Sequence, residues 1–205
     1  MSIFRIVNQW GAVTGCVLVA LVSSACSPAL DWREVALDEA SALYGQFPCK
    51  PERHERTLQP TGTTQVLNVT LWSCEASGMN WALSRAVVAQ PAEVSAMLAA
   101  WPRWTQANLE AASQGLAQPV AVEVQELGAV EVPGMTPWPQ AKAWNMRTER
   151  PDAAGQPLPV AVTSWHFAHG LTVYQAAVWR AGVDANTSNG DDVMNAFFQG
   201  FQFRP

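Results

Sequence analysis

The chain has 205 residues, of which 14% are charged, and a formal net charge of −5. This mild acidity argues against binding to nucleic acid, which needs clustered Lys and Arg, and against electrostatic docking on anionic lipid. The length is sufficient for one domain with a sizeable core.

Residues 1–25 have the pattern of a secretory signal peptide. Arg5 precedes an uncharged run from Gly11 to Val22, and small residues follow up to Cys26. A charged start, a short apolar run and small residues at the cleavage site define such signals, and this run is too short to span a bilayer. We therefore expect export by the Sec-type route and removal of the segment. Because Arg5 leaves with it, the formal net charge falls from −5 to −6.

The residues directly before Cys26 resemble the lipobox of bacterial lipoproteins. That resemblance implies that Cys26 carries acyl chains such as palmitate and becomes the new N-terminus, with residues 26–30 as a tether. Ser23 stands where the lipobox more often has Leu. Ser27 is not the Asp associated with retention in the inner membrane, so the resemblance implies the periplasmic face of the outer membrane. The alternative is an ordinary signal peptide cut nearby, which would leave a soluble periplasmic protein.

The four cysteines are expected to have different roles. Cys16 leaves with the signal and Cys26 carries lipid, so Cys49 and Cys74 remain. Two thiols in an oxidising compartment most often form a disulfide. The alternative is a metal pair or a catalytic thiol, but neither cysteine belongs to a CxxC motif or has a neighbouring His that could activate it.

The remainder, residues 31–205, is predicted to form a single globular α+β domain. Gln65 to Cys74 is rich in β-branched and aromatic residues, and its side chains alternate between two faces, with Leu67, Val69 and Leu71 on one of them, which is typical of a strand. Met79 to Val88 is predicted to pair back against it. Together with the other strands they predict an antiparallel sheet of about six strands. The further strand ranges are 31–35, 120–127, 142–148, 159–167 and 171–179.

Two helices are expected to pack on this sheet. The longer one covers about 91–113, beginning with Pro91, and Pro102 inside it should kink or break it. The shorter one begins near Asp191 and ends at Gly200. The charged segment from Cys49 to Arg56 is predicted as a solvated turn, and Pro133–Pro139 as a rigid loop.

Three segments carry a resemblance to a known group. They are the aromatic-Pro-x-Lys-Pro segment Phe47–Pro51, the strand Gly170–Gln175 and the closing aromatic helix Ala196–Phe201. With the order of the elements, they resemble small bacterial envelope lipoproteins whose fold is similar to the PsbP-like group. These are packing motifs without catalytic residues, so the resemblance implies a non-enzymatic binding or accessory role.

Motifs with catalytic or metal-binding chemistry are weak. His166 and His169 are three residues apart, a spacing that places them on opposite faces of a strand, so a shared metal is not expected. The segment Asp184–Asp192 has the oxygen side chains of a calcium loop, but Asn189 and Asn195 stand where that loop needs Gly and Glu. No nucleotide-binding or serine-hydrolase motif is present. We therefore expect no cofactor, no metal and no enzymatic activity.

Ten tryptophans are the most unusual feature of the composition. Each is more simply explained by core packing, but large aromatic side chains also build interfaces and ligand pockets. We take Trp72, Trp81, Trp165 and Trp179 as the candidate binding residues. The leading hypothesis is docking of an exposed aromatic face on an envelope protein. The alternative is small-molecule or lipid binding in a Trp-lined pocket between sheet and helix, and an enzyme would be a third class without residues to support it.

Overall fold

The computed structural model describes residues 30–38, 42–59, 66–182 and 191–204. The predicted signal peptide, Cys26, most of the tether and most of the segment Asp184–Asp192 lie outside these ranges. The strands are β1 (Arg33–Asp38), β2 (Leu43–Phe47), β3 (Glu52–Leu58), β4 (Leu67–Ala76), β5 (Met79–Val87), β6 (Glu123–Ala129), β7 (Lys142–Pro151), β8 (Pro157–His169), β9 (Thr172–Ala181) and β10 (Gln202–Phe203), and the helices are α1 (Pro91–Ser113) and α2 (Asp191–Gln199).

Ten strands form two antiparallel sheets in the described parts of the chain. The large sheet has the order β3-β4-β5-β9-β8-β7-β6, and the small sheet has the order β1-β2-β10. The large sheet consists of two meanders, β3–β5 and β6–β9, which are joined in the chain by α1 and in space by the pairing of β5 with β9. The α+β class and the long and short helices are therefore as predicted.

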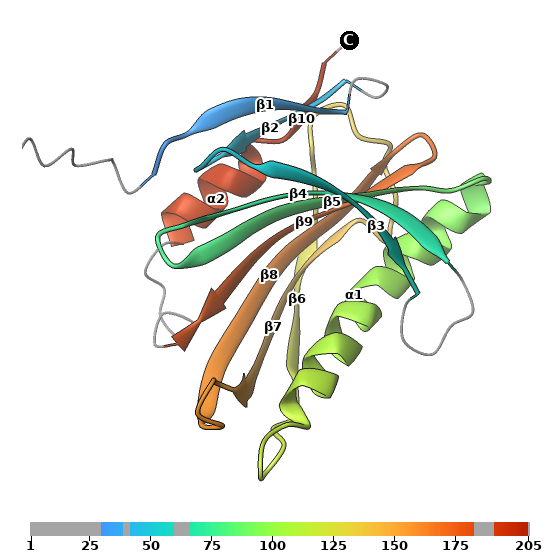
Figure 1. Ribbon diagram of the computed structural model, residues 1–205. Coiled ribbons are helices and arrows are strands. Elements are labelled where there is room, and N and C mark those ends of the chain that lie inside the picture. Colours follow the sequence, from blue (N-terminus) through green and yellow to red (C-terminus); the bar gives the residue numbers. More distant parts are fainter. Residues whose placement is uncertain (1–29, 39–41, 60–65, 183–190, 205) are drawn as a thin grey trace, which may run out of the picture.

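The two faces of the large sheet have different partners, because side chains alternate between the faces of a strand. On one face, Trp81 and Tyr174 pack in the main core with Phe197 of α2 and Leu43 of the small sheet. On the other face, Val173 packs with apolar residues of α1. Figure 1 shows α1 crossing the sheet and α2 lying beside the small sheet. The fold is thus a sheet between two covering layers.

Helix α1 matches its predicted bounds, but Pro102 does not end it. The helix is continuous from Pro91 to Ser113, with the Pro102 ring buried. A proline inside a helix removes one hydrogen bond and disturbs the preceding turn. Here the buried residues Leu98 and Trp101 before it and Leu109 after it anchor both halves on the sheet. Tertiary packing therefore holds the helix together across the proline.

The segment from Cys49 to Arg56 was expected to be a solvated turn, and this is wrong. Most of it belongs to β3, which pairs residue by residue with β4 from Glu52↔Ser73 to Leu58↔Leu67. As an edge strand with mostly exposed side chains, β3 has no apolar alternation for a pattern to detect. Charged side chains on an edge strand also oppose pairing with other chains. The predicted strand 31–35 corresponds to β1 and lies in the small sheet, so with β3 included the large sheet has seven strands where about six were expected.

The predicted disulfide between Cys49 and Cys74 is confirmed. Cys49 lies between β2 and β3, Cys74 lies in β4, and their Cα atoms are 6.0 Å apart. The bond therefore ties the link between the two sheets to the interior of the large sheet. Among the residues that the structure describes, no helix is long and apolar enough to cross a membrane.

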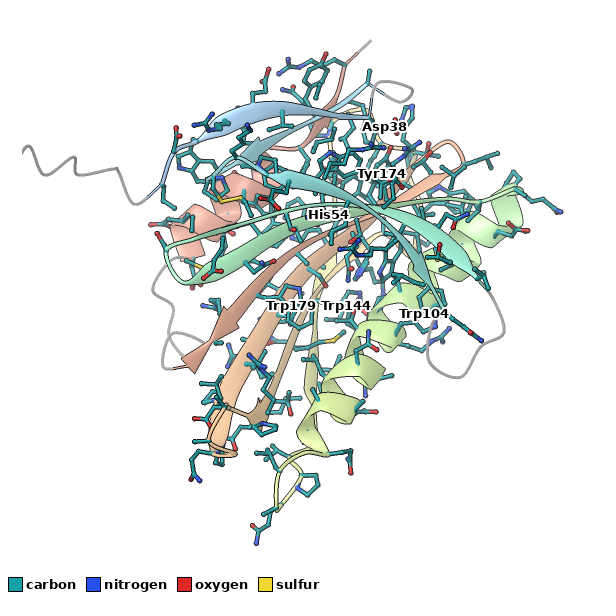
Figure 2. The ribbon with its side chains drawn as sticks, in the orientation of Figure 1. Asp38, His54, Trp104, Trp144, Tyr174 and Trp179 are labelled. Carbon is teal, nitrogen blue, oxygen red and sulfur yellow. A yellow bond between two sulfur atoms is a disulfide. The ribbon has the colours of Figure 1, made fainter. Side chains whose placement is uncertain are left out.

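A buried polar contact connects the small sheet to the large one. Asp38 of β1 accepts a hydrogen bond from the Tyr174 hydroxyl at 2.9 Å and lies 3.0 Å from Nε of Arg85. Asp38 and Tyr174 are labelled together at the top of Figure 2. The Asp38 side chain is only 5% exposed, whereas that of Arg85 is 22% exposed.

Replacing Asp38 by Ala is expected to lower the free energy of unfolding by about 2–3 kcal/mol. The change removes an acceptor from a buried hydroxyl and a partner from a largely buried cation, while partial exposure of Arg85 moderates the loss. Urea denaturation measures it. The matched control is Glu34→Ala, because Glu34 lies on the same strand but pairs with Arg204 at the exposed surface, where ion pairs contribute little. Equal losses in the two variants would contradict the assignment.

Candidate functional site

The four tryptophans chosen from the sequence do not come together. Trp72 and Trp81 are buried in the core on the side of α2, with exposed fractions of 5% and 0%. Trp165 is half-buried on the same side and stacks on Phe198 of α2 at 5.2 Å. Trp179 is half-buried on the opposite face, with α1. Packing therefore accounts for the first three.

An exposed aromatic face is also absent from the described residues. Trp32 is the most exposed tryptophan there, at 37%. It lies directly before β1, and no other exposed aromatic residue accompanies it in the described ranges. The other exposed large apolar residues are aliphatic and scattered over several elements. Candidate binding surfaces must therefore be sought in grooves.

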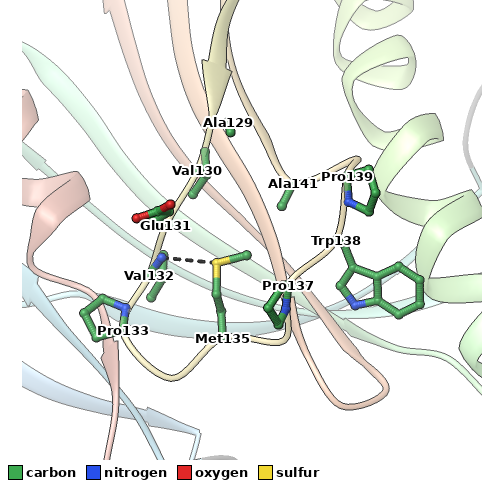
Figure 3. Close-up of a pocket in the computed structure, with 10 residues that line it drawn as sticks. All are labelled: Ala129, Val130, Glu131, Val132, Pro133, Met135, Pro137, Trp138, Pro139 and Ala141. Atoms are coloured by element: carbon green, nitrogen blue, oxygen red, sulfur yellow. Dashed lines mark hydrogen bonds between the residues drawn. The ribbon is translucent and has the colours of Figure 1, made fainter.

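One groove lies in the loop between β6 and β7 and has a volume of about 640 Å³. Its apolar base includes the buried residues Val130, Val132 and Ala141, and the half-buried Met135 and Trp138 add larger side chains (Figure 3). Glu131 is the single charged side chain among the lining residues. The complete lining is Ala129, Val130, Glu131, Val132, Pro133, Met135, Pro137, Trp138, Pro139 and Ala141.

The sequence of this loop fixes its shape, as the predicted rigid loop implied. Prolines hold φ near one value and remove backbone donors that would otherwise need partners. Gly134 adopts φ +82°, and a Cβ there would lie 2.8 Å from Cβ of Phe203. The remaining backbone is tied down, because the N–H of Thr136 donates to the carbonyl of Ala168 at 2.8 Å and that of Phe203 donates to Pro133 at 2.8 Å. Contacts with Ala168 and Phe203 therefore hold the loop in this shape.

A second groove, of about 460 Å³, opens between α1 and the large sheet. Leu109 and Ala112 of α1 line it, together with Val160 and Trp179 of the sheet. Figure 2 shows Trp144 and Trp179 on the side of the sheet that α1 crosses. Polar side chains, including Asn80, Asn108 and Arg150, complete the lining. Of the four candidate tryptophans, Trp179 lines this groove.

The two histidines of β8 lie on opposite faces of the sheet, as their spacing predicted. The His169 ring stacks on Phe203 at 4.4 Å, and its Nδ1 lies 2.9 Å from the carbonyl oxygen of Gly134. The fully buried His166 ring lies on the α1 side, 6.5 Å from that of Trp101. In the described ranges, no group of three or more His, Cys, Asp or Glu side chains is placed to hold a metal ion.

Burial controls the protonation of His166. Removal of the ring from water disfavours the imidazolium and lowers the pKa of His166 from 6.5 to about 3, while the backbone of Lys142 acts in the opposite direction. The side chain is therefore a neutral imidazole at any physiological pH, with one donor and one acceptor nitrogen.

Comparison with solved structures gives a weak likeness. No protein-family model matches the chain, and no curated protein matches it. Among solved structures, it is similar to LpqN, described as involved in cell envelope biogenesis of Mycobacterium tuberculosis. The TM-score is 0.33 and the sequence identity 16%, over 85% of this chain and 79% of LpqN.

Proposed function

We propose that this protein is a non-enzymatic binding or accessory module of a bacterial cell envelope. In this proposal Cys26 is lipidated, the mature chain is held at the periplasmic face of the outer membrane, and the domain is related to the PsbP-like group. The groove of the β6–β7 loop takes up apolar side chains from an envelope protein.

The observation that carries this proposal is the preformed apolar groove of about 640 Å³. Met and aromatic side chains are enriched at protein interfaces, and the unbranched, polarisable Met135 adapts its shape to a partner. A rigid loop loses little conformational entropy when it binds. The same groove exposes Pro133, Pro137 and Pro139, which offer apolar surface without backbone donors.

Site-specific photo-crosslinking in cells tests the groove. A photoreactive phenylalanine analogue at Pro137 is expected to give a discrete protein adduct, and adding Met135→Glu should reduce its yield at least tenfold by placing a charge in the groove. The control is the same analogue at Leu171, an exposed apolar residue in the β8–β9 turn. No adduct at position 137, or equal yields at both positions, would contradict the proposal. The intact mass of the purified protein separately tests acylation of Cys26.

The groove between α1 and the sheet supports a second candidate function, the binding of a small apolar molecule. A volume of about 460 Å³ lies within the range of small-molecule sites, and Trp179 supplies an aromatic wall. Native mass spectrometry of protein extracted gently from its own envelope separates the two candidates. A retained small adduct that is lost in Trp179→Ala favours the second, and a retained protein subunit favours the first.

A further inference from the structure

Polar side chains are buried together beneath α1, in the interior of the helix–sheet layer. Ser164 and His166 are two residues apart on β8 and therefore share a face, and they are 1% and 0% exposed. Strand pairing places Trp144 of β7 opposite Ser164 and Gln175 of β9 opposite His166. The register thus brings residues from three strands to one location.

The hydrogen-bonding atoms of three of these side chains have no partner in the described parts of the chain. They are Oγ of Ser164, Nε1 of Trp144 and both ring nitrogens of His166. The backbone of Lys142 acts to raise the pKa of His166, but it makes no hydrogen bond with either ring nitrogen. The neighbouring Gln175 is already engaged, since it donates to Oγ1 of Thr105 at 3.0 Å.

Such a group of unpaired atoms is unusual, because nearly all buried polar atoms in proteins are hydrogen bonded to the chain or to ordered water. One unpaired atom could reflect a local imperfection of packing. Here three such side chains occupy adjacent register positions on one face of two neighbouring strands. They are complementary to a polar group that the chain itself does not supply.

We propose that the layer between α1 and strands β7–β8 is a binding site for a neutral hydrogen-bonding group, held by Ser164, His166 and Trp144. The indole of Trp144 only donates, whereas the hydroxyl of Ser164 and a neutral imidazole each donate and accept. A group that both accepts and donates, such as a hydroxyl or water, satisfies this set.

A charged group does not fit the same site. The three side chains carry no formal charge, since His166 is neutral, and transferring an unpaired ion into such an interior is strongly unfavourable. Lys142, which lies on β7 two residues before Trp144, is already paired with Glu126 at 2.7 Å. The occupant is therefore a neutral alcohol-like group.

The helix–sheet groove lies on the same face of β8 as this site. Val160 and Trp179 line the groove, and Trp179 pairs with Val162, which precedes Ser164 by two residues on the same face. Val160 and Val162 thus lie between the groove and Ser164 along the same face of β8. An amphiphile with a neutral polar head fits this order, and a water molecule satisfies the polar end alone.

A titration with 1-octanol, followed by tryptophan fluorescence, distinguishes the two sources. If the hydroxyl comes from a ligand, the mature protein should bind 1-octanol, and Ser164→Ala should raise the Kd about 5–10-fold. Octanoate should bind at least tenfold more weakly than 1-octanol. The matched control is Ser95→Ala, because Ser95 is a half-buried serine of α1 outside the site. His166→Leu provides a second variant with the same expected direction.

A crystal structure of the same protein at high resolution completes the test. If Ser164→Ala leaves 1-octanol binding unchanged, an ordered water bonded to at least two of the three side chains identifies water as the occupant. If neither water nor 1-octanol lies within hydrogen-bonding distance of them, the proposal is overturned. Equal affinity for octanoate and 1-octanol, with both dependent on Ser164, would overturn the neutral character of the site.

Discussion

Lowering the pH from 7 to 3 is expected to reduce the free energy of unfolding by about 4 kcal/mol through His166 alone. The pKa of His166 is lowered from 6.5 to about 3 in the folded protein. Below pH 6.5 the unfolded chain binds a proton at this residue and the folded chain does not, so stability falls by about 1.4 kcal/mol per pH unit. The loss levels off below the folded-state pKa, where both states are protonated.

The contribution is isolated by comparing variants, because carboxylates also titrate in this range. Urea denaturation at several pH values between 7 and 3 should give a shallower decline for His166→Leu than for the natural chain. The groups that face the ring, Trp101 and Gln175, do not titrate over this interval, and the Lys142–Glu126 pair is present in both proteins. The control is His54→Gln, since His54 is 36% exposed on β3. Parallel pH profiles for all three proteins would refute the prediction.

Loss of the disulfide is expected to lower the free energy of unfolding by about 3.5 kcal/mol. Cys49 and Cys74 are separated by 25 positions in the chain, and the bond restricts the unfolded ensemble by closing this loop. It also ties the β2–β3 link to β4, so its removal should loosen the attachment of the small sheet.

Urea denaturation with and without a reducing agent measures this effect. Reduction should destabilise the natural protein but leave Cys49→Ala/Cys74→Ala unchanged, because that variant has no bond to reduce. The double variant under oxidising conditions should match the reduced natural protein within about 1 kcal/mol. A reducing agent that destabilises both proteins equally would show that the bond is not responsible.

Local patterns predicted the elements that are amphipathic along their own length. The β-branched and aromatic residues of Gln65–Cys74, and the short turn before Met79–Val88, predicted β4, β5 and their antiparallel pairing, which the register confirms. Helical spacing of apolar residues predicted α1 within its observed bounds. In each case one buried face dictates the period of the sequence, so the pattern is visible without knowledge of the partner.

Other features depended on contacts between distant segments. β3 has charged side chains on both faces and becomes a strand because β4 offers it an edge. Pro102 remains helical because buried residues on either side of it hold α1 to the sheet. The separation of Trp179 from Trp72 and Trp81 follows from which face of a strand each residue occupies and from which helix covers that face.

The sequence by itself determined the α+β class, the main hairpin, both helices and the Cys49–Cys74 pairing, because these follow from local periodicity or from counting thiols in an oxidising compartment. Only the tertiary structure shows where grooves and buried polar clusters lie. The loop groove requires Phe203 and Ala168 to hold residues 133–136 from distant parts of the chain. The proposed site of Ser164, His166 and Trp144 requires β7 and β8 to pair in one register beneath α1. Grooves and buried polar clusters are formed by residues that are far apart in the sequence, and local sequence patterns do not predict which of these residues come into contact.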